Sequence, residues 1–304
     1  MMDPNYKIEI IYRLMKVKGI GVVKTNHLLR TIMQNGADCD SLNYCIEQQL
    51  SLDEKQKYRE TKVHLDTLFE FPINYISILD NNYPCELKRY LSHTTPPVLS
   101  YIGNINLLSK RKVGFCGSRK VSAKGIAITE DCVKQLSNRK ICVVSGYAQG
   151  VDLVAHETAL RNGTSTIIVL PEGIECFKIK KELKNIWDWD RVLVISEFQP
   201  KDNWTIGRAM SRNSTIIGLS EIFVVIEAGN TGGSLDAGLK ILKKGTKTVF
   251  VPQYKVAPES AQGNDILINN GAIPIKMKQD TGLANLRQLF ELLDDPNYIG
   301  NNLF

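Results

Sequence analysis

Residues 112–152 read KVGFCGSRKVSAKGIAITEDCVKQLSNRKICVVSGYAQGVD. The stretch begins with an apolar run at 112–116, continues through a segment with helical periodicity, and reaches a second apolar run at 141–144 before a glycine-rich loop. Continuous rather than alternating hydrophobicity indicates strands that are buried on both faces, as in a parallel sheet covered by helices. The stretch therefore predicts a strand–helix–strand unit.

The same rhythm extends toward the C-terminus. Four more short apolar runs follow, separated by segments rich in helix formers, at 166–170, 192–195, 222–226 and 248–251. Six such runs predict an α/β domain with a doubly wound, mostly parallel sheet.

The N-terminal part has a different pattern, in which Ile8, Ile11, Tyr12 and Met15 recur at helical spacing before a Gly-Ile-Gly break at 19–21. A second helical stretch follows the break. The pattern is typical of a small all-helical domain of the helix-hairpin-helix type. Either the hairpin amides meet a phosphate or the glycines only form a turn.

We therefore expect three regions: a small helical domain at 1–75, an α/β domain at 76–276 and a short C-terminal tail at 277–304.

Composition and charge limit the function classes. The chain has 304 residues with 43% hydrophobic and 23% charged, which excludes a disordered, collagen-like or wholly coiled-coil protein. The net charge is +6, and residues 81–304 carry 28 basic and 21 acidic side chains. A polyanionic partner is therefore expected to bind the second part of the chain.

The cysteines and the N-terminus indicate a cytoplasmic protein. Seven cysteines form no CxxC pair, so we expect free thiols in a reducing compartment and no metal site. The N-terminus has no apolar segment typical of a signal peptide, and no apolar run is long enough to span a bilayer. No membrane partner is expected.

The residues that follow the strands are candidates for ligand binding, because ligands of doubly wound sheets bind outside the carboxyl ends of the strands. Glycine lets the backbone approach a ligand closely, and the helix N-termini beyond such loops attract anions. A single loop of this kind is often only a tight turn, but several at one sheet edge indicate a phosphate site. The candidates from these loops are Gly117, Ser118, Arg119, Ser145, Gly146, Gly232, Gly233 and Ser234.

Cationic and aromatic residues near this edge of the sheet are further candidates for ligand binding. A guanidinium at a strand end, as at Arg119, can bind a phosphate with two hydrogen bonds. Aromatic residues interleaved with cations are typical of sites for single-stranded nucleic acid, although core packing explains the tryptophans at 187, 189 and 204 better. The further candidates are Phe177, Lys178, Lys180, Lys181, Arg212 and Asn213.

Catalysis has little support in the sequence. Neither GxGxxG after the first strand nor a P-loop is present, so we expect no nucleotide cofactor. Asp152 and His156 are spaced as an acid–base pair, but a helix-capping carboxylate and a buried histidine explain them better. We expect no catalytic residues.

An ordered series of motifs resembles the DNA-processing protein A family (DprA, also called Smf) over about residues 8–276. The matching segments are Tyr83-Pro84, Pro96–Leu99, Gly117–Arg119, Ser145–Asp152, Ala155-His156, Arg212-Asn213, Gly218–Ser220, Glu227-Ala228, Gly233–Leu235, Gly263-Asn264 and Gly271-Ala272.

The resemblance implies an extended Rossmann-like domain that binds single-stranded DNA, helps load the RecA recombinase in natural transformation, and forms homodimers. By position it implies a DNA pocket around Arg119, with Arg212 and the lysines at 178–181 as neighbours and Phe177 stacking a base. The chain departs from the family at Ser214, where a second arginine is usual, and at Phe177-Lys178, where Tyr-Pro is usual. We also expect it to lack the C-terminal winged-helix domain of some members.

Two alternatives remain. One is a nucleotide-sensing or nucleotide-hydrolysing Rossmann-like protein similar to the LOG-type phosphoribohydrolases, whose PGGxGTxxE motif is loosely echoed at 227–234 without its final glutamate. The other is a defence-associated relative that keeps the fold and has a different partner.

Overall fold

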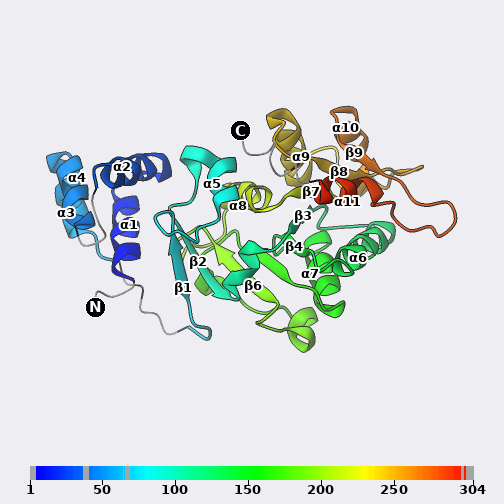
Figure 1. Cartoon of the computed structure of the whole chain (residues 1–304), viewed down its shortest axis with the longest axis horizontal. Helices are drawn as coiled ribbons and strands as arrows, with labels where there is room; N and C mark the ends of the chain where they lie inside the picture. Colours follow the sequence, from blue (N-terminus) through cyan, green and yellow to red (C-terminus); the bar gives the residue numbers. More distant parts are fainter. Residues whose placement is uncertain (1–4, 37–40, 64, 66–68, 296–297, 299–304) are drawn as a thin grey trace. The chain divides into compact units, whose positions relative to one another are not determined.

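Figure 1 shows a computed structural model of the chain, which describes residues 5–36, 41–63, 65, 69–295 and 298. Contacts within the chain define two compact units. Unit 1 comprises Met1–Ile102, Glu172–Cys176 and Ile195–Asn203, and unit 2 comprises Gly103–Pro171, Phe177–Val194 and Trp204–Phe304. The three regions expected at 1–75, 76–276 and 277–304 remain a prediction. Cys39 lies outside the described residues.

Unit 1 begins with the predicted helices. Ile8, Ile11 and Tyr12 lie on the buried face of the first helix, and Gly19, with φ +91°, forms the break before the second. The elements of unit 1 are α1 (Tyr6–Lys16), α2 (Val22–Gln34), α3 (Leu42–Gln49), α4 (Leu52–Glu60), β1 (Asn74–Ser77), α5 (Cys85–Leu91), the 3-10 helices Ser92–Thr94 and Ile174–Cys176, and β2 (Val98–Gly103).

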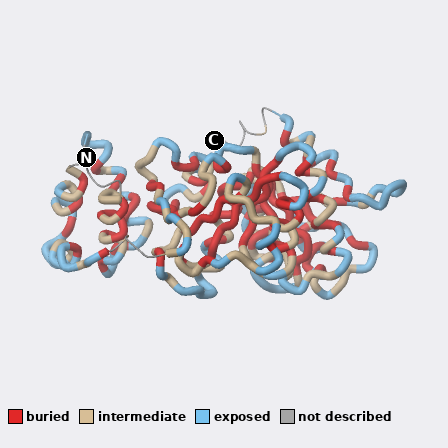
Figure 2. The backbone as a smooth tube through the Cα atoms, turned by 90° about the horizontal axis from the view of Figure 1, so that it is seen from below, coloured by how far each residue is buried: buried red, intermediate tan, exposed pale blue. Residues whose placement is uncertain are grey.

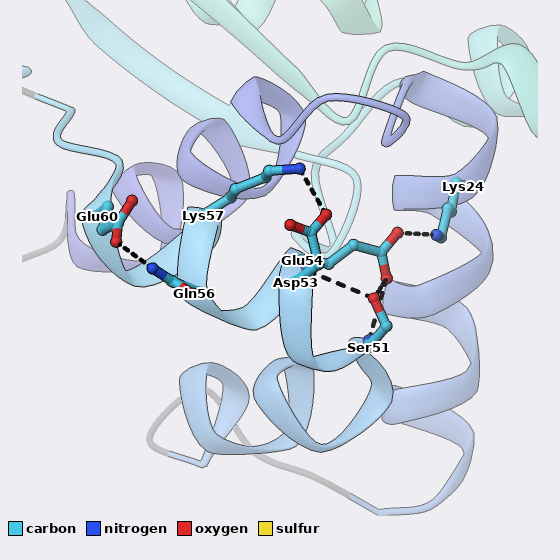
Figure 3. A network of polar contacts seen from close by, with 7 residues as sticks. All are labelled: Lys24, Ser51, Asp53, Glu54, Gln56, Lys57 and Glu60. Carbon is cyan, nitrogen blue, oxygen red and sulfur yellow. Dashed lines mark hydrogen bonds and ion pairs between the residues drawn. The ribbon is translucent and has the colours of Figure 1, made fainter.

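A polar network joins α4 to α2 (Figure 3). Ser51 and Glu54 form a capping box, in which each side chain accepts a hydrogen bond from the backbone N–H of the other. Glu54 also pairs with Lys24 of α2, and this hydrogen bond lowers the pKa of the Glu54 carboxyl. The cap therefore both starts α4 and ties it to its neighbour.

Unit 2 contains five of the six predicted strands and most of the sixth, β6, whose last residues belong to unit 1. The elements are β3 (Lys112–Cys116), α6 (Ala123–Ser137), β4 (Cys142–Ser145), α7 (Val151–Arg161), β5 (Thr166–Val169), β6 (Val192–Ser196), α8 (Ile206–Leu219), β7 (Ile222–Val225), α9 (Gly233–Lys244), β8 (Val249–Pro252), α10 (Asn264–Asn269), β9 (Ile273–Ile275) and α11 (Arg287–Asp294), with 3-10 helices at Ile105–Ser109, Lys181–Ile186 and Glu259–Ala261.

The described strands form a nine-stranded, mostly parallel sheet in the order β1-β2-β6-β5-β4-β3-β7-β8-β9. β1 and β2 pair antiparallel within unit 1. In unit 2 the chain steps from β3 outward through β4 and β5, then returns so that β7 pairs parallel with the other side of β3. The doubly wound α/β class predicted from the sequence is confirmed.

Helices cover both faces of this sheet. A core cluster joins β3, β4, β7 and β8 to α6 and α7 through residues such as Phe115, Leu136 and Ala155. α8 contacts β3, β4 and β5, and α9 and α10 contact β8. In Figure 2 the buried residues lie mainly in the interior and the exposed residues mainly on the outside. Burial on both faces explains why these strands have continuous apolar runs.

The segment after residue 276 contributes to this core. Leu286, Leu289 and Leu293 are buried in the same cluster, and the side chain of Gln135 in α6 donates a hydrogen bond of 2.9 Å to the carbonyl of Ala284. The leucines have the three- and four-residue spacing of an amphipathic helix, so their burial explains why α11 forms.

None of the helices in the described part of the chain is both long and apolar enough to cross a membrane.

The capping box gives a first test. Replacing Ser51 with alanine removes the side-chain acceptor at the start of α4, so we expect the variant to lose about 1 kcal/mol of stability. Urea unfolding measured by circular dichroism checks this. Ser109→Ala replaces an exposed serine elsewhere and should stay within about 0.5 kcal/mol of the parent. Equal unfolding midpoints for the two variants would contradict the role of the cap.

Candidate functional site

A cavity of about 750 Å³ lies where the loops after β3 and β7 meet the face of α8. This is the point at which the order of the strands reverses, and doubly wound sheets bind their ligands there. The lining residues all belong to unit 2. They are Cys116, Gly117, Ser118, Arg119, Ala148, Asp152, Trp204, Ile206, Ala209, Met210, Arg212, Asn213, Ile216, Gly229, Thr231, Gly232, Gly233, Ser234, Asp236 and Ser260.

Two glycines allow the loop after β3 to pack closely. A Cβ at Gly117 would lie 2.5 Å from the side chain of Val151 in α7. Gly150 has φ +80°, and a Cβ there would lie 2.3 Å from the carbonyl oxygen of Ser118. These contacts hold the backbone of residues 117–119 against the start of α7, so the loop has a fixed path along the cavity.

The loop after β7 ends at the N-terminus of α9. Gly232, with φ +109°, is the N-cap residue and has no side chain with which to cap the helix. The amides of the first turn, beginning at Gly233, carry the positive end of the helix dipole. Because Gly232, Gly233 and Ser234 line the cavity, this wall is suited to an anion.

Arg119 is the accessible cation of the cavity. Its side chain is exposed, and its guanidinium makes no hydrogen bond or ion pair with any residue that the structure describes. A guanidinium without a protein partner keeps all its donors available for a ligand oxygen.

Arg212 lies in a different environment, although it also lines the cavity. Arg212 is only 5% exposed, and its Nη1 donates a hydrogen bond of 3.1 Å to the carbonyl of Val169 at the end of β5. The same nitrogen lies 4.0 Å from a carboxylate oxygen of Asp152. A Cβ at Gly146 would lie 1.6 Å from Nη1, so only glycine leaves room for this guanidinium. Arg212 therefore braces α8 against the strand ends.

Asp152 organises the same corner. Its carboxylate lies 3.0 Å from the hydroxyl of the buried Ser145 and accepts a hydrogen bond of 3.2 Å from the backbone N–H of Ala148. Ser145 and Gly146 are buried and outside the cavity lining, and they shape the site from behind.

His156 is fully buried in α7. Its Nε2 donates to the carbonyl of Gly146 at 2.5 Å, and Nδ1 lies 2.6 Å from the hydroxyl of Thr166. Burial lowers the pKa of the imidazole to about 4. The expectation of a buried, hydrogen-bonded histidine is confirmed, whereas the expected helix-capping role of Asp152 is wrong, because Gly150 is the N-cap of α7 and no side chain caps it. The imidazole also holds in place the carbonyl of Gly146, the glycine that Arg212 contacts.

Two other side chains with titratable groups lie near the cavity and are constrained by their surroundings. Burial raises the pKa of the Cys116 thiol, which keeps it protonated. Glu227 is fully buried and accepts hydrogen bonds from Ser122, Tyr254 and Ser260. Within the described residues, no group of three or more His, Cys, Asp or Glu side chains is arranged to hold a metal ion.

The residues predicted after β5 lie outside the cavity lining. The ring of Phe177 is 2% exposed and packs against Tyr147, Trp187 and Trp189, so it has no open face for a base. Lys180 lies over the ring of Tyr147 and donates to its carbonyl at 2.7 Å. Lys178 and Lys181 are exposed. β5 is two strands away from β3, which separates these residues from the loops after β3 and β7.

Trp187 and Trp189 pack against each other. They follow a 3-10 helix rather than lying within a helix, and their rings pack edge to face at 5.2 Å. Core packing therefore accounts for them.

The sequence interpretation missed Ile206 and Met210, which line the cavity from α8. They share helical spacing with Asn213, which was a predicted site residue, so the sequence could have placed them on the same face of the helix.

His156 should make stability depend on pH. Its folded-state pKa of about 4 lies below the ordinary value of 6.5, so the folded state favours the neutral ring. The stabilisation is fully present above about pH 6.5 and is lost as the pH falls toward 4, by about 3 kcal/mol. Unfolding free energies measured from pH 7 to pH 4 test this. The loss of stability over this pH range should be smaller by that amount in His156→Gln and unchanged in His27→Gln, whose ring is exposed. An unchanged loss in His156→Gln would refute the assignment.

The Gly146–Arg212 contact gives a further test. Gly146→Ala should destabilise the fold by about 1–3 kcal/mol because the added methyl group overlaps the guanidinium. Gly207→Ala is the matched control, since a Cβ there meets nothing closer than 4.0 Å and alanine favours a helix. Thermal unfolding of the two variants should shift in opposite directions, and equal shifts would argue against the close contact.

Comparisons with known proteins agree with this architecture. The family model for DNA recombination-mediator protein A matches residues 74–285. The DNA processing protein DprA of Streptococcus pneumoniae is 30% identical over 281 residues, which cover 88% of this chain and 96% of the relative. Its X-ray structure aligns with a TM-score of 0.70 at 28% identity, covering 90% of this chain and 95% of that one. The DprA structure from Helicobacter pylori shares the fold, with a TM-score of 0.61 at 23% identity over 74% of this chain and 96% of its own. The chain belongs to the DNA recombination-mediator protein A family.

Proposed function

We propose that this protein binds single-stranded DNA through the cavity between the loops after β3 and β7, and acts as a recombination mediator without an enzymatic step. The observation that carries the proposal is the exposed, unpaired guanidinium of Arg119 beside the glycine loops and the N-terminus of α9. This combination suits a phosphate group.

Arg119 is the one cation in the cavity lining that no carboxylate of the described residues neutralises. Arg212 lies near Asp152, and Asp236 pairs with Lys240 at 2.8 Å. Each of these cations is balanced by a carboxylate. An incoming phosphate would therefore gain its charge-assisted hydrogen bonds chiefly from Arg119, supported by backbone amides.

Relatives support a nucleic-acid role. The Streptococcus pneumoniae and Bacillus subtilis relatives are DNA processing proteins, and the Helicobacter pylori structure concerns a single-stranded DNA binding mode of that protein. We propose the same ligand here. RecA loading, natural transformation, a homodimer and a cytoplasmic location are further parts of the proposal, supported by the family membership.

A salt series tests the site. The affinity of the full chain for an oligo-dT strand is measured by fluorescence anisotropy at several salt concentrations. Removing one phosphate contact lowers the slope of log K against log salt, so we expect Arg119→Ala to bind more weakly, with a slope reduced by about 0.7.

Two control variants sharpen the result. Lys243→Ala removes an exposed charge at the far end of α9, outside the cavity lining, and should leave the slope unchanged. Lys178→Ala with Lys181→Ala tests whether the DNA path extends toward β5. If Arg119→Ala and Lys243→Ala behave alike, the cavity is not the DNA site.

The size of the cavity favours mononucleotide sensing as a second candidate function. A volume of about 750 Å³ lies within the range of about 300–1,000 Å³ of small-molecule sites. Isothermal titration of nucleoside monophosphates against the full chain separates the two. Tight mononucleotide binding without oligonucleotide binding, or release of free base, would replace the DNA proposal.

A further inference from the structure

An apolar wall lies in the same cavity as Arg119. Trp204, Ile206 and Met210 line it and are 46%, 70% and 43% exposed. They are three of the ten large hydrophobic residues that are exposed in the described part of the chain. Side chains of this size are normally buried, and an exposed cluster of them marks a surface that a ligand covers.

The wall follows from the local sequence. Thr205 caps α8 by accepting a hydrogen bond from the N–H of Arg208 at 3.1 Å, and Trp204 immediately precedes this cap. Ile206, Met210 and Asn213 then recur at helical spacing, so one face of α8 lines the cavity. This face is apolar over its first turns and becomes polar at Asn213.

The cavity therefore combines two chemistries. Its strand-end loops offer a cation and amides suited to a phosphate, and the start of α8 offers an indole with two aliphatic side chains. A nucleotide has the same division, because a charged phosphate is joined to a flat base with an apolar face. A purely electrostatic track for a DNA backbone would not need the second wall.

We propose that Trp204, supported by Ile206 and Met210, is the surface on which one base of a bound single strand stacks while a neighbouring phosphate meets Arg119. The inference rests on the proposed function and adds how the base is held. It moves the stacking role from Phe177, whose ring is 2% exposed, to an indole that is open to solvent.

The test compares two ligands that differ only in their bases. An oligo-dT strand and an abasic strand of equal length carry the same phosphates, so the difference between their affinities reports the bases. We expect the full chain to prefer oligo-dT, and Trp204→Ala to weaken oligo-dT binding between about 5-fold and about 150-fold, the range for losing one stacked base. Binding of the abasic strand and its salt slope should stay unchanged.

Two further variants make the result specific. Trp204→Phe keeps a ring and should retain most of the preference for oligo-dT. Leu283→Ala removes another apolar side chain of unit 2, 45% exposed and outside the cavity lining, and should leave the binding of both strands unchanged. Stacking should also quench the fluorescence of Trp204, so the quenching seen with oligo-dT should disappear in Trp204→Phe.

The outcomes separate this inference from the proposed function. If the parent protein binds neither strand, the DNA-binding proposal itself fails. If the parent binds both strands equally, or if Trp204→Ala weakens both equally, DNA binding stands and the stacking wall is refuted. If Trp204→Ala changes neither affinity, the wall serves a different partner and the inference is overturned.

Discussion

The parallel pairing of β7 with β3 creates the site. Three strands and their connecting segments separate these two strands in the sequence, yet the register places Gly114 beside Phe223 and Cys116 beside Val225. The loops after both strands then open at the same edge of the sheet, with α8 crossing beside them. If β7 were added beyond β6 instead, the Gly-Ser-Arg loop and the glycines before α9 would lie at opposite ends of the sheet, and no cavity would combine them.

Two arginines of the site illustrate how burial divides similar residues into different roles. Arg119 presents its hydrogen-bond donors to solvent, whereas Arg212 donates a hydrogen bond to the carbonyl of Val169 and lies beside the carboxylate of Asp152. Much of the glycine-rich loop after β4 supports this second arginine: Gly146 leaves space for it, and His156 holds the carbonyl of that glycine. The loop after β4 therefore mainly holds α8 in place, and α8 in turn forms one wall of the cavity.

The sequence predicted the features that come from local pattern. Six strands buried on both faces were recognised because most of their buried residues are apolar on both sides, and the glycine loops were placed correctly at strand ends. β9 was missed because three residues including Pro274 carry too little pattern. The burial of Phe177 and the bracing role of Arg212 were also missed. Both depend on which segments meet in space, and neither is encoded in the spacing along the chain.

The closure of the unit 2 core by α11 has a consequence for the synthesis of the protein. The side chain of Arg111, just before β3, donates a hydrogen bond to the carbonyl of Leu293, 182 residues later. A ribosome must therefore reach Leu293 before this contact can form, whereas the helices α1 to α4 are synthesised earlier. Contacts between such distant segments form slowly. The core of unit 2 therefore stays open until α11 has been synthesised, and chains with such incomplete cores are prone to aggregate.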